Sequence, residues 1–294
     1  MNARRASPLP ARSLLERAAD IHDFASFTRP ATDPRPAGRP ISTPSRFASI
    51  DLDALRNAGC IIPGEPAGMI AEEFRLVKRH LLQPGGAARD RLILVTSAQP
   101  GEGKTFCAVN LALSMASERD IEVLLVDADF TRPGVLARLG VPEGAGLMDA
   151  VTDPAVDVER CIVRTDVRGL SVMPAGRIIH DGNEYLASAR AASLLAGLVE
   201  RHPSRVVILD SPAVLAASIA ADLARHAGQA LLVVRADRTV EADIAEAIGL
   251  IGACPHIRLL LNDAAFNARR RRFGPHYGAP QRPPFVPGEH GLVQ

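Results

Sequence analysis

The sequence predicts an α/β protein with a doubly wound, mainly parallel sheet flanked by helices. Strands of such sheets are buried on both faces, so they are almost continuously apolar. Six segments have this character, at residues 91–96, 122–126, 170–173, 206–209, 230–234 and 257–261. Helical patterns lie at residues 104–118, 183–201, 216–227 and 240–252. Because this order alternates strands with helices, ligands are expected beyond the carboxyl ends of the strands.

Composition excludes several classes of protein. Apolar residues make up 47% of the 294 residues, which is enough for a buried core and excludes disorder throughout. No run approaches the roughly 18 to 20 apolar residues that cross a bilayer, and the N-terminus lacks the apolar segment of a signal peptide. A cytoplasmic protein with reduced cysteines is therefore expected. With two Tyr and no Trp, nucleic acid is not an expected partner.

Charge divides the chain into three parts. Residues 1–46 hold eight Arg and four acidic residues, a net of +4, and residues 267–294 hold five Arg and one Glu, again +4. Since the whole chain carries +1, residues 47–266 carry −7. We expect a basic, Pro/Arg-rich flexible segment at 1–46, one folded domain at 47–266, and a basic flexible tail at 267–294.

An amphipathic helix is predicted before the first core strand, within residues 47–90. Four apolar residues recur there at helical spacing and would pack on the core, namely Ile70, Phe74, Val77 and Leu81. On the outer face, Glu72 and Arg75 can pair at i,i+3. From the pattern alone, this helix is either a solvated, salt-bridged surface or a contact with another subunit.

A glycine-rich turn follows the first strand of the core. Residues 97–105 read S-A-Q-P-G-E-G-K-T, a relaxed phosphate loop in which Ala98 replaces the first glycine of G-x-x-x-x-G-K-[ST]. Gly101 and Gly103 would let backbone N–H groups surround phosphate oxygens at a helix N-terminus. Lys104, one of only two lysines among 34 basic residues, would reach the β and γ phosphates, and Thr105 would bind Mg²⁺. The alternative is a glycine turn before an ordinary helix.

Carboxylates follow two further strands. Asp127 and Asp129 end the strand after the loop, and Asp210 ends the strand at 206–209. An aspartate at a strand end is often only a cap for the next helix. Three of them downstream of a phosphate loop favour instead the metal side of a nucleotide site.

These motifs resemble those of the bacterial tyrosine kinases of capsule and exopolysaccharide synthesis. That family combines P-G-E-G-K-[ST], D-x-D-x-x-R-P and D-[ST]-P-P, which stand here at residues 100–105, 127–133 and 210–213, with Ala213 in place of the last proline. The similarity covers roughly residues 50–265. Its stand-alone, exosortase-associated form is the most similar one at residues 13–19 and 72–79. The resemblance implies a P-loop NTPase of the deviant Walker, SIMIBI-like type.

The resemblance also implies roles for individual residues. ATP would be bound by Pro100, Gly101, Glu102, Gly103, Lys104, Thr105 and Phe106, with Asn262 beside the adenine. Thr105 would hold Mg²⁺ together with Asp129 and Asp210 through water, and Asp127 would accept the tyrosine proton. Glu72, Arg75 and Lys78 match the family's E-x-x-R-x-x-R oligomerisation pattern, with lysine in the last place. A homo-oligomer is thus expected.

The tail departs from the family pattern. Relatives carry several tail tyrosines that are autophosphorylated, whereas this tail holds only Tyr277. Tyr185 lies in a predicted helix and is expected to be a packing residue. The sequence therefore leaves open whether the chain is a tyrosine autokinase that acts on Tyr277 or a nucleotide-switched assembly module with little phosphotransfer.

A partitioning or cell-division ATPase is a third possibility, and one residue argues against it. That group has a signature lysine five residues before the loop lysine, and here this residue is Gln99. The run Arg269–Arg272 could be a solvated tail or could contact anionic lipid or an acidic partner. Family members need an activating segment from a membrane chain-length regulator. The resemblance thus implies that a partner supplies this segment in trans and recruits the chain peripherally to the inner membrane.

Overall fold

One mixed sheet organises the described part of the chain, which in this computed structural model comprises residues 46–82, 86–179 and 182–264. The strand order is β1-β4-β5-β3-β6-β2-β7-β8. The strands are β1 (Arg46–Ala48), β2 (Leu92–Ser97), β3 (Glu122–Asp127), β4 (Val163–Thr165), β5 (Leu170–Met173), β6 (Arg205–Asp210), β7 (Gln229–Arg235) and β8 (His256–Asn262). Neighbouring strands pair in parallel except β4 and β5. The predicted fold class is confirmed.

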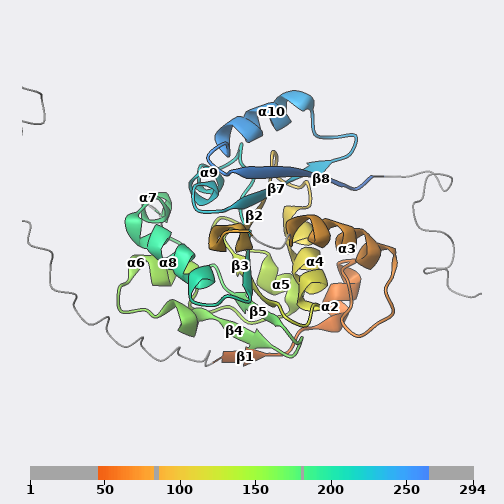
Figure 1. Ribbon diagram of the computed structural model, residues 1–294, viewed down its shortest axis with the longest axis horizontal. Helices are drawn as coiled ribbons and strands as arrows, with labels where there is room; N and C mark the ends of the chain where they lie inside the picture. Colours follow the sequence, from red (N-terminus) through yellow and green to blue (C-terminus); the bar gives the residue numbers. More distant parts are fainter. Residues whose placement is uncertain (1–45, 83–85, 180–181, 265–294) are drawn as a thin grey trace, which may run out of the picture. The chain divides into compact units, whose positions relative to one another are not determined.

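Helices cover both faces of the sheet (Figure 1). They are α2 (Leu52–Asn57), α3 (Met69–Leu81), α4 (Lys104–Ala116), α5 (Val135–Leu139), α6 (Leu147–Thr152), α7 (Gly182–Leu186), α8 (Ala189–Glu200), α9 (Ile219–Ala224) and α10 (Glu241–Leu250). Short 3-10 helices lie at η2 (Ala88–Arg91) and η3 (Val158–Cys161). One apolar cluster joins the sheet to α6, α8, α9 and α10, and the other joins it to α2, α3, α4 and α5.

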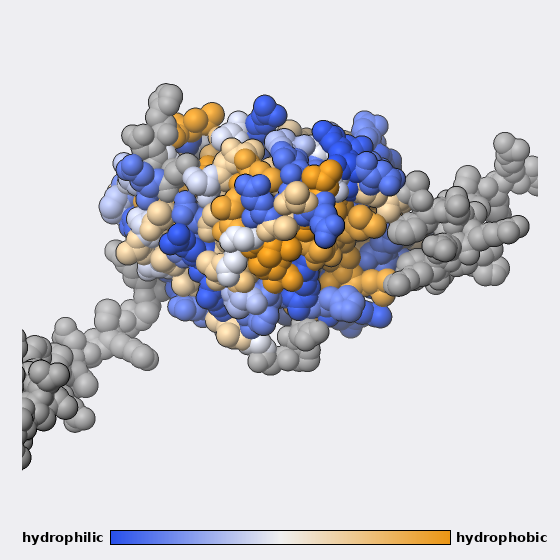
Figure 2. Space-filling view, turned by 90° about the horizontal axis from the view of Figure 1, so that it is seen from above, coloured by the Kyte–Doolittle hydropathy of each residue, from blue (hydrophilic) through white to orange (hydrophobic). Residues whose placement is uncertain are grey.

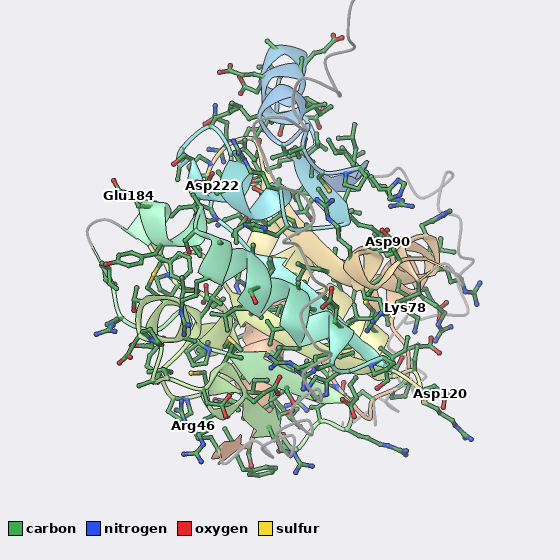
Figure 3. The ribbon with its side chains drawn as sticks, turned by 60° about the vertical axis from the view of Figure 1, so that its left-hand side comes forward. Arg46, Lys78, Asp90, Asp120, Glu184 and Asp222 are labelled. Atoms are coloured by element: carbon green, nitrogen blue, oxygen red, sulfur yellow. The ribbon has the colours of Figure 1, made fainter. Side chains whose placement is uncertain are left out.

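The two clusters follow from the alternation of side chains along each strand. In β2, Leu92 and Leu94 enter the first cluster while Ile93 and Val95 enter the second. A side-chain view shows the same two layers, because Glu184 of α7 and Lys78 of α3 lie on opposite sides of the molecule (Figure 3). Both faces of the central strands are therefore buried from solvent, as the apolar runs predicted.

All six predicted strands are present, but the structure adds β1 and β4. Each has only three residues, which is too short to give a periodic pattern. The helix predicted over residues 183–201 is two helices, because Ser188 starts α8 as an N-cap that accepts a hydrogen bond from the Ala191 backbone N–H. Residues 13–19, which resemble the exosortase-associated form, and the basic tail lie outside the described residues.

The sheet ends at β1 on one side and at β8 on the other. Leu259 and Leu261 of β8 are more than half exposed, and Leu250 of α10 is nearly half exposed. Figure 2 looks down on this side of the molecule and shows apolar residues gathered at the surface.

All four cysteines are free and buried, as expected, and no helix in the described ranges is long and apolar enough to span a bilayer.

Candidate nucleotide site

The phosphate-loop residues lie where three central strands end. The loop joins β2 to α4, and α4 begins at Lys104. The register of the sheet places Asp127 at the end of β3 opposite Asp210 at the end of β6, and Asp210 opposite Val95 of β2. Parallel pairing thus brings three motifs that are far apart in sequence to one edge of the sheet, as predicted.

Two glycines allow the loop to take its shape. Gly101 has φ 82° and Gly103 has φ 97°, and both values lie in the left-handed region that other residues avoid. Gly103 has a second constraint, because a Cβ there would collide with the side-chain amide of Asn262. Ala98, which replaces the first glycine of the motif, is fully buried, so its methyl group packs in the core. The relaxed motif therefore fits this fold.

Lys104 forms an ion pair across the site. Its Nζ lies 2.9 Å from Oδ2 of Asp129, and both side chains are largely buried. The other oxygen of Asp129 accepts hydrogen bonds from the Thr131 hydroxyl at 2.7 Å and from the Arg132 backbone N–H at 3.0 Å. Burial alone would raise the pKa of Asp129, but the bonds from Thr131 and Lys104 hold it below its ordinary value. Asp129 is thus ionised and paired.

Asp127 organises the backbone of its own motif. Its Oδ2 accepts hydrogen bonds from the N–H groups of Gly134 at 2.9 Å and Val135 at 3.0 Å, and its Oδ1 accepts one from Asp129 at 3.2 Å. Burial raises the pKa of Asp127 to about 6, and these N–H groups limit the rise. A carboxylate with such a pKa can accept a proton near neutral pH, although most of its acceptor capacity is in use.

Asp210 differs because neither carboxylate oxygen has a hydrogen-bond partner among the described residues. The side chain is fully buried, and burial raises its pKa to about 7. Lys104 and the Thr105 hydroxyl act in the opposite direction. Thr105 is near enough to lower this pKa, yet it makes no hydrogen bond of normal geometry to either oxygen. A buried carboxylate without partners indicates a site for a cation or a donor.

The side chains of Thr105, Asp129 and Asp210 would supply only some of the direct ligands of a magnesium ion. No three His, Cys, Asp or Glu side chains of the described chain converge on one point. Mg²⁺, however, commonly keeps several waters and binds to one or two carboxylates plus substrate phosphates. Thr105 and the free oxygens of Asp210 suit that mode, whereas Asp129 would also have to keep its pair with Lys104.

Three residues predicted to contact the nucleotide use their side chains elsewhere. The Glu102 side chain is buried and accepts hydrogen bonds from Gln99 and Thr239. Phe106 forms an edge-to-face contact with Phe74 of α3, at a centroid distance of 6.5 Å. Asn262 donates through Nδ2 to the Glu102 carbonyl at 2.9 Å. A contact between Asn262 and adenine stays a prediction.

The predicted oligomerisation residues separate into two kinds. Arg75 is exposed and pairs with Glu72 at 2.6 Å, as the i,i+3 spacing predicted. Lys78 instead points inward, where it is 5% exposed and binds Glu118 at 2.6 Å and the Ser114 carbonyl at 2.9 Å. Its partners lie in its own chain, at the end of α4. A role of Lys78 in oligomerisation stays a prediction.

The structure describes only one of the two tyrosines. Tyr185 of α7 is 41% exposed, so its expected role as a packing residue is wrong. Tyr277 and Arg269–Arg272 lie outside the described residues. Sequence reasoning missed Thr131, whose hydroxyl holds Asp129, and Gly134, which lies against Thr105. Thr131 could have been found from its place two residues after Asp129, since hydroxyl residues commonly bond to nearby carboxylates.

A mainly parallel sheet that carries a lysine-bearing glycine loop against acidic strand ends defines a P-loop nucleotide-binding protein. No protein-family model matches the chain. The chain is 30% identical over 172 residues to tyrosine-protein kinase wzc of Salmonella typhimurium, covering 58% of this chain and 23% of that one. It is 27% identical over 190 residues to tyrosine-protein kinase YwqD of Bacillus subtilis, covering 65% and 78%.

A solved structure agrees with these relatives. The kinase domain of Escherichia coli tyrosine kinase ETK superimposes with a TM-score of 0.63 at 25% identity, covering 80% of this chain and 87% of that domain. The chain is therefore similar to bacterial tyrosine kinases both in sequence and in fold. It spans only about a quarter of the length of relatives such as wzc.

Proposed function

We propose that this chain is an ATP- and Mg²⁺-dependent protein tyrosine kinase that phosphorylates Tyr277 and regulates exopolysaccharide or capsule synthesis and export. The observation that carries the proposal is the juxtaposition of the Lys104–Asp129 ion pair with the buried carboxylate of Asp210, which has no hydrogen-bond partner among the residues that the structure describes. The first supplies a cation for phosphate, and the second supplies free oxygens for a metal shell. Mg²⁺ bound there would neutralise the charge of the phosphates.

Each of these residues has its own role in the transfer of the γ-phosphoryl group. The loop N–H groups and Lys104 hold the ATP phosphates and orient the γ-phosphoryl group. The tyrosine oxygen forms a bond to the γ-phosphorus while the bond from that phosphorus to the bridging oxygen breaks, and ADP leaves. The phenolic proton passes to a carboxylate, for which the raised pKa of Asp127 makes it the first candidate.

The alternative function is a nucleotide-switched, oligomeric regulator with little phosphotransfer. Two observations favour it: the tail holds a single tyrosine, and the oxygens of Asp127 already accept three backbone N–H groups. In this alternative, bound ATP would favour one assembly state without transfer.

The proposal includes the setting of the protein. The chain would work in the cytoplasm as a homo-oligomer, with Glu72 and Arg75 of α3 at the subunit contact. A membrane chain-length regulator would supply an activating segment in trans and recruit it to the inner membrane. Nucleic acid has no part. The similarity of residues 13–19 and 72–79 to the stand-alone, exosortase-associated form supports this arrangement.

Phosphosite mapping after incubation with Mg·ATP tests the proposal. Wild type is expected to gain phosphotyrosine at residue 277, and Lys104→Met and Tyr277→Phe are expected to gain none there. Each reaction is run with and without the cytoplasmic segment of the membrane regulator. Wild type that binds ATP and self-associates but shows no phosphotyrosine in either condition would exclude the kinase and leave the switch.

A further inference from the structure

The phosphate loop contains one carboxylate, that of Glu102, and both of its oxygens are bonded to protein groups. Glu102 is 1% exposed, and its Oε2 accepts the backbone N–H of Gln99 at 2.9 Å, across the base of the loop. Its Oε1 accepts the hydroxyl proton of Thr239, which lies in the turn between β7 and α10. A buried carboxylate is therefore satisfied by two donors from opposite sides.

The direction of these hydrogen bonds is fixed. The Thr239 hydroxyl oxygen already accepts the Arg235 backbone N–H at 2.9 Å, so its single proton is directed to Glu102. The Gln99 backbone N–H can only donate. Both side-chain oxygens of residue 102 must consequently be acceptors. A carboxylate meets this requirement and an amide of the same shape does not.

A third contact reaches the loop from the last strand of the sheet. Asn262 of β8 donates to the Glu102 carbonyl, and its amide occupies the space where a side chain at Gly103 would lie. Gln99 adds a bond to Asp243 of α10 at 3.2 Å. The loop is thus tied to β7, α10 and β8 on the side away from the Lys104–Asp129 pair.

We infer that Glu102, Thr239 and Asn262 form a loop clamp that holds the phosphate loop in its anion-binding shape before a nucleotide arrives. Glu102 and Thr239 are positioning residues, because they act through the backbone of the loop and not by contact with phosphate. Preorganisation of this kind lowers the ordering cost of binding. The inference rests on the proposed nucleotide-binding function of this loop and adds residues from a turn that the loop motif does not include.

Hydrogen exchange and nucleotide titration of the full chain test the clamp. Thr239→Val removes the hydroxyl, Thr239→Ser keeps it, and Glu102→Gln replaces one acceptor by a donor. Thr165→Val is the matched control, because this hydroxyl donates to the Leu170 carbonyl at 2.8 Å at the far side of the sheet.

In nucleotide-free protein, exchange of the Gln99 amide is expected to be about tenfold faster in Thr239→Val and Glu102→Gln than in wild type, as for one lost hydrogen bond to a buried charged group. The dissociation constant for a fluorescent ATP analogue with Mg²⁺ is expected to rise by about the same factor. Thr239→Ser and Thr165→Val are expected to stay within about twofold of wild type.

The outcomes separate the two proposals. If Thr239→Val and Glu102→Gln match Thr165→Val in both measurements, the clamp is overturned. Should Thr239→Val fail to fold, Glu102→Gln and Thr239→Ser decide the same question. If wild type binds no nucleotide, the proposed function fails, while the exchange rates of the free protein still show whether the clamp holds the loop.

Discussion

At the scale of single residues, the site keeps two carboxylates in different states. Asp129 is ionised because Lys104 and Thr131 bind it, whereas Asp210 is buried with no hydrogen-bond partner in the described part of the chain. An unpaired buried charge is costly, so Asp210 takes up a proton more readily than an exposed aspartate does. In a nucleotide site a bound cation would remove this cost, so the buried carboxylate of Asp210 favours metal binding.

The pH dependence of stability should reveal Asp210. In metal-free protein the pKa values of Asp127 and Asp210 are about 6 and about 7, against 3.8 in the unfolded chain. Between these values the folded chain holds protons that the unfolded chain has released, so the stability that these two groups contribute is fully present below about pH 3.8 and is lost as the pH rises through 6 and 7. We expect urea unfolding in EDTA to show a loss of a few kcal/mol from about pH 5 to about pH 8.

Asp210→Asn provides the comparison for that measurement. The amide carries no charge at either pH, so most of the difference between the two conditions should disappear. Stability at the higher pH should rise by roughly 1–3 kcal/mol relative to wild type. A variant whose profile runs parallel to that of wild type would show that Asp210 is not the titrating group.

At the scale of elements, α3 is joined firmly to the phosphate-loop helix. Lys78 binds the Ser114 carbonyl, the Ser117 hydroxyl and Glu118, all at the C-terminal end of α4. A cation there is favourable because the helix dipole is negative at this end. At the other end of α4, Phe106 packs against Phe74 of α3. The two helices should therefore move together.

Replacement of Lys78 should destabilise the fold more than replacement of Arg75. Lys78→Ala leaves polar groups at the end of α4 without their buried partner and should cost about 2–3 kcal/mol of unfolding free energy. Arg75→Ala removes an ion pair in which the arginine side chain is 44% exposed and the Glu72 side chain 12% exposed, and should cost about 1 kcal/mol. If Arg75 lies at a subunit contact, its loss should weaken self-association in sedimentation experiments. Equal stability losses in the two variants would contradict this division.

The elements also show what could be predicted from the sequence. Long apolar runs identified every central strand, and the loop, Asp127, Asp129 and Asp210 were expected together because each follows a strand of one parallel sheet. The burial of Lys78 could not be predicted, because a buried lysine has the same helical spacing as an exposed one. The partner of Glu102 could not be found, since Thr239 lies 137 residues away and only the fold brings them together.

At the scale of the whole molecule, the site draws on most of the sheet. The loop comes from β2 and α4, the carboxylates from β3 and β6, and the clamp from the β7–α10 turn and β8. A ligand that binds across these elements binds the folded chain and not the unfolded one. Binding should therefore stabilise the whole domain and not only the loop.

Thermal unfolding with Mg·ATP measures this linkage. At a concentration of about 100 times the dissociation constant, one bound nucleotide should add about 2.7 kcal/mol and raise the melting temperature by roughly 5–10 °C. Lys104→Met should unfold as a single domain but show little shift, because the cation that meets the phosphates is gone. Asp129 keeps its bonds from Thr131 and the Arg132 N–H, so the variant should still fold. An equal shift in both proteins would mean that ATP binds elsewhere on the chain.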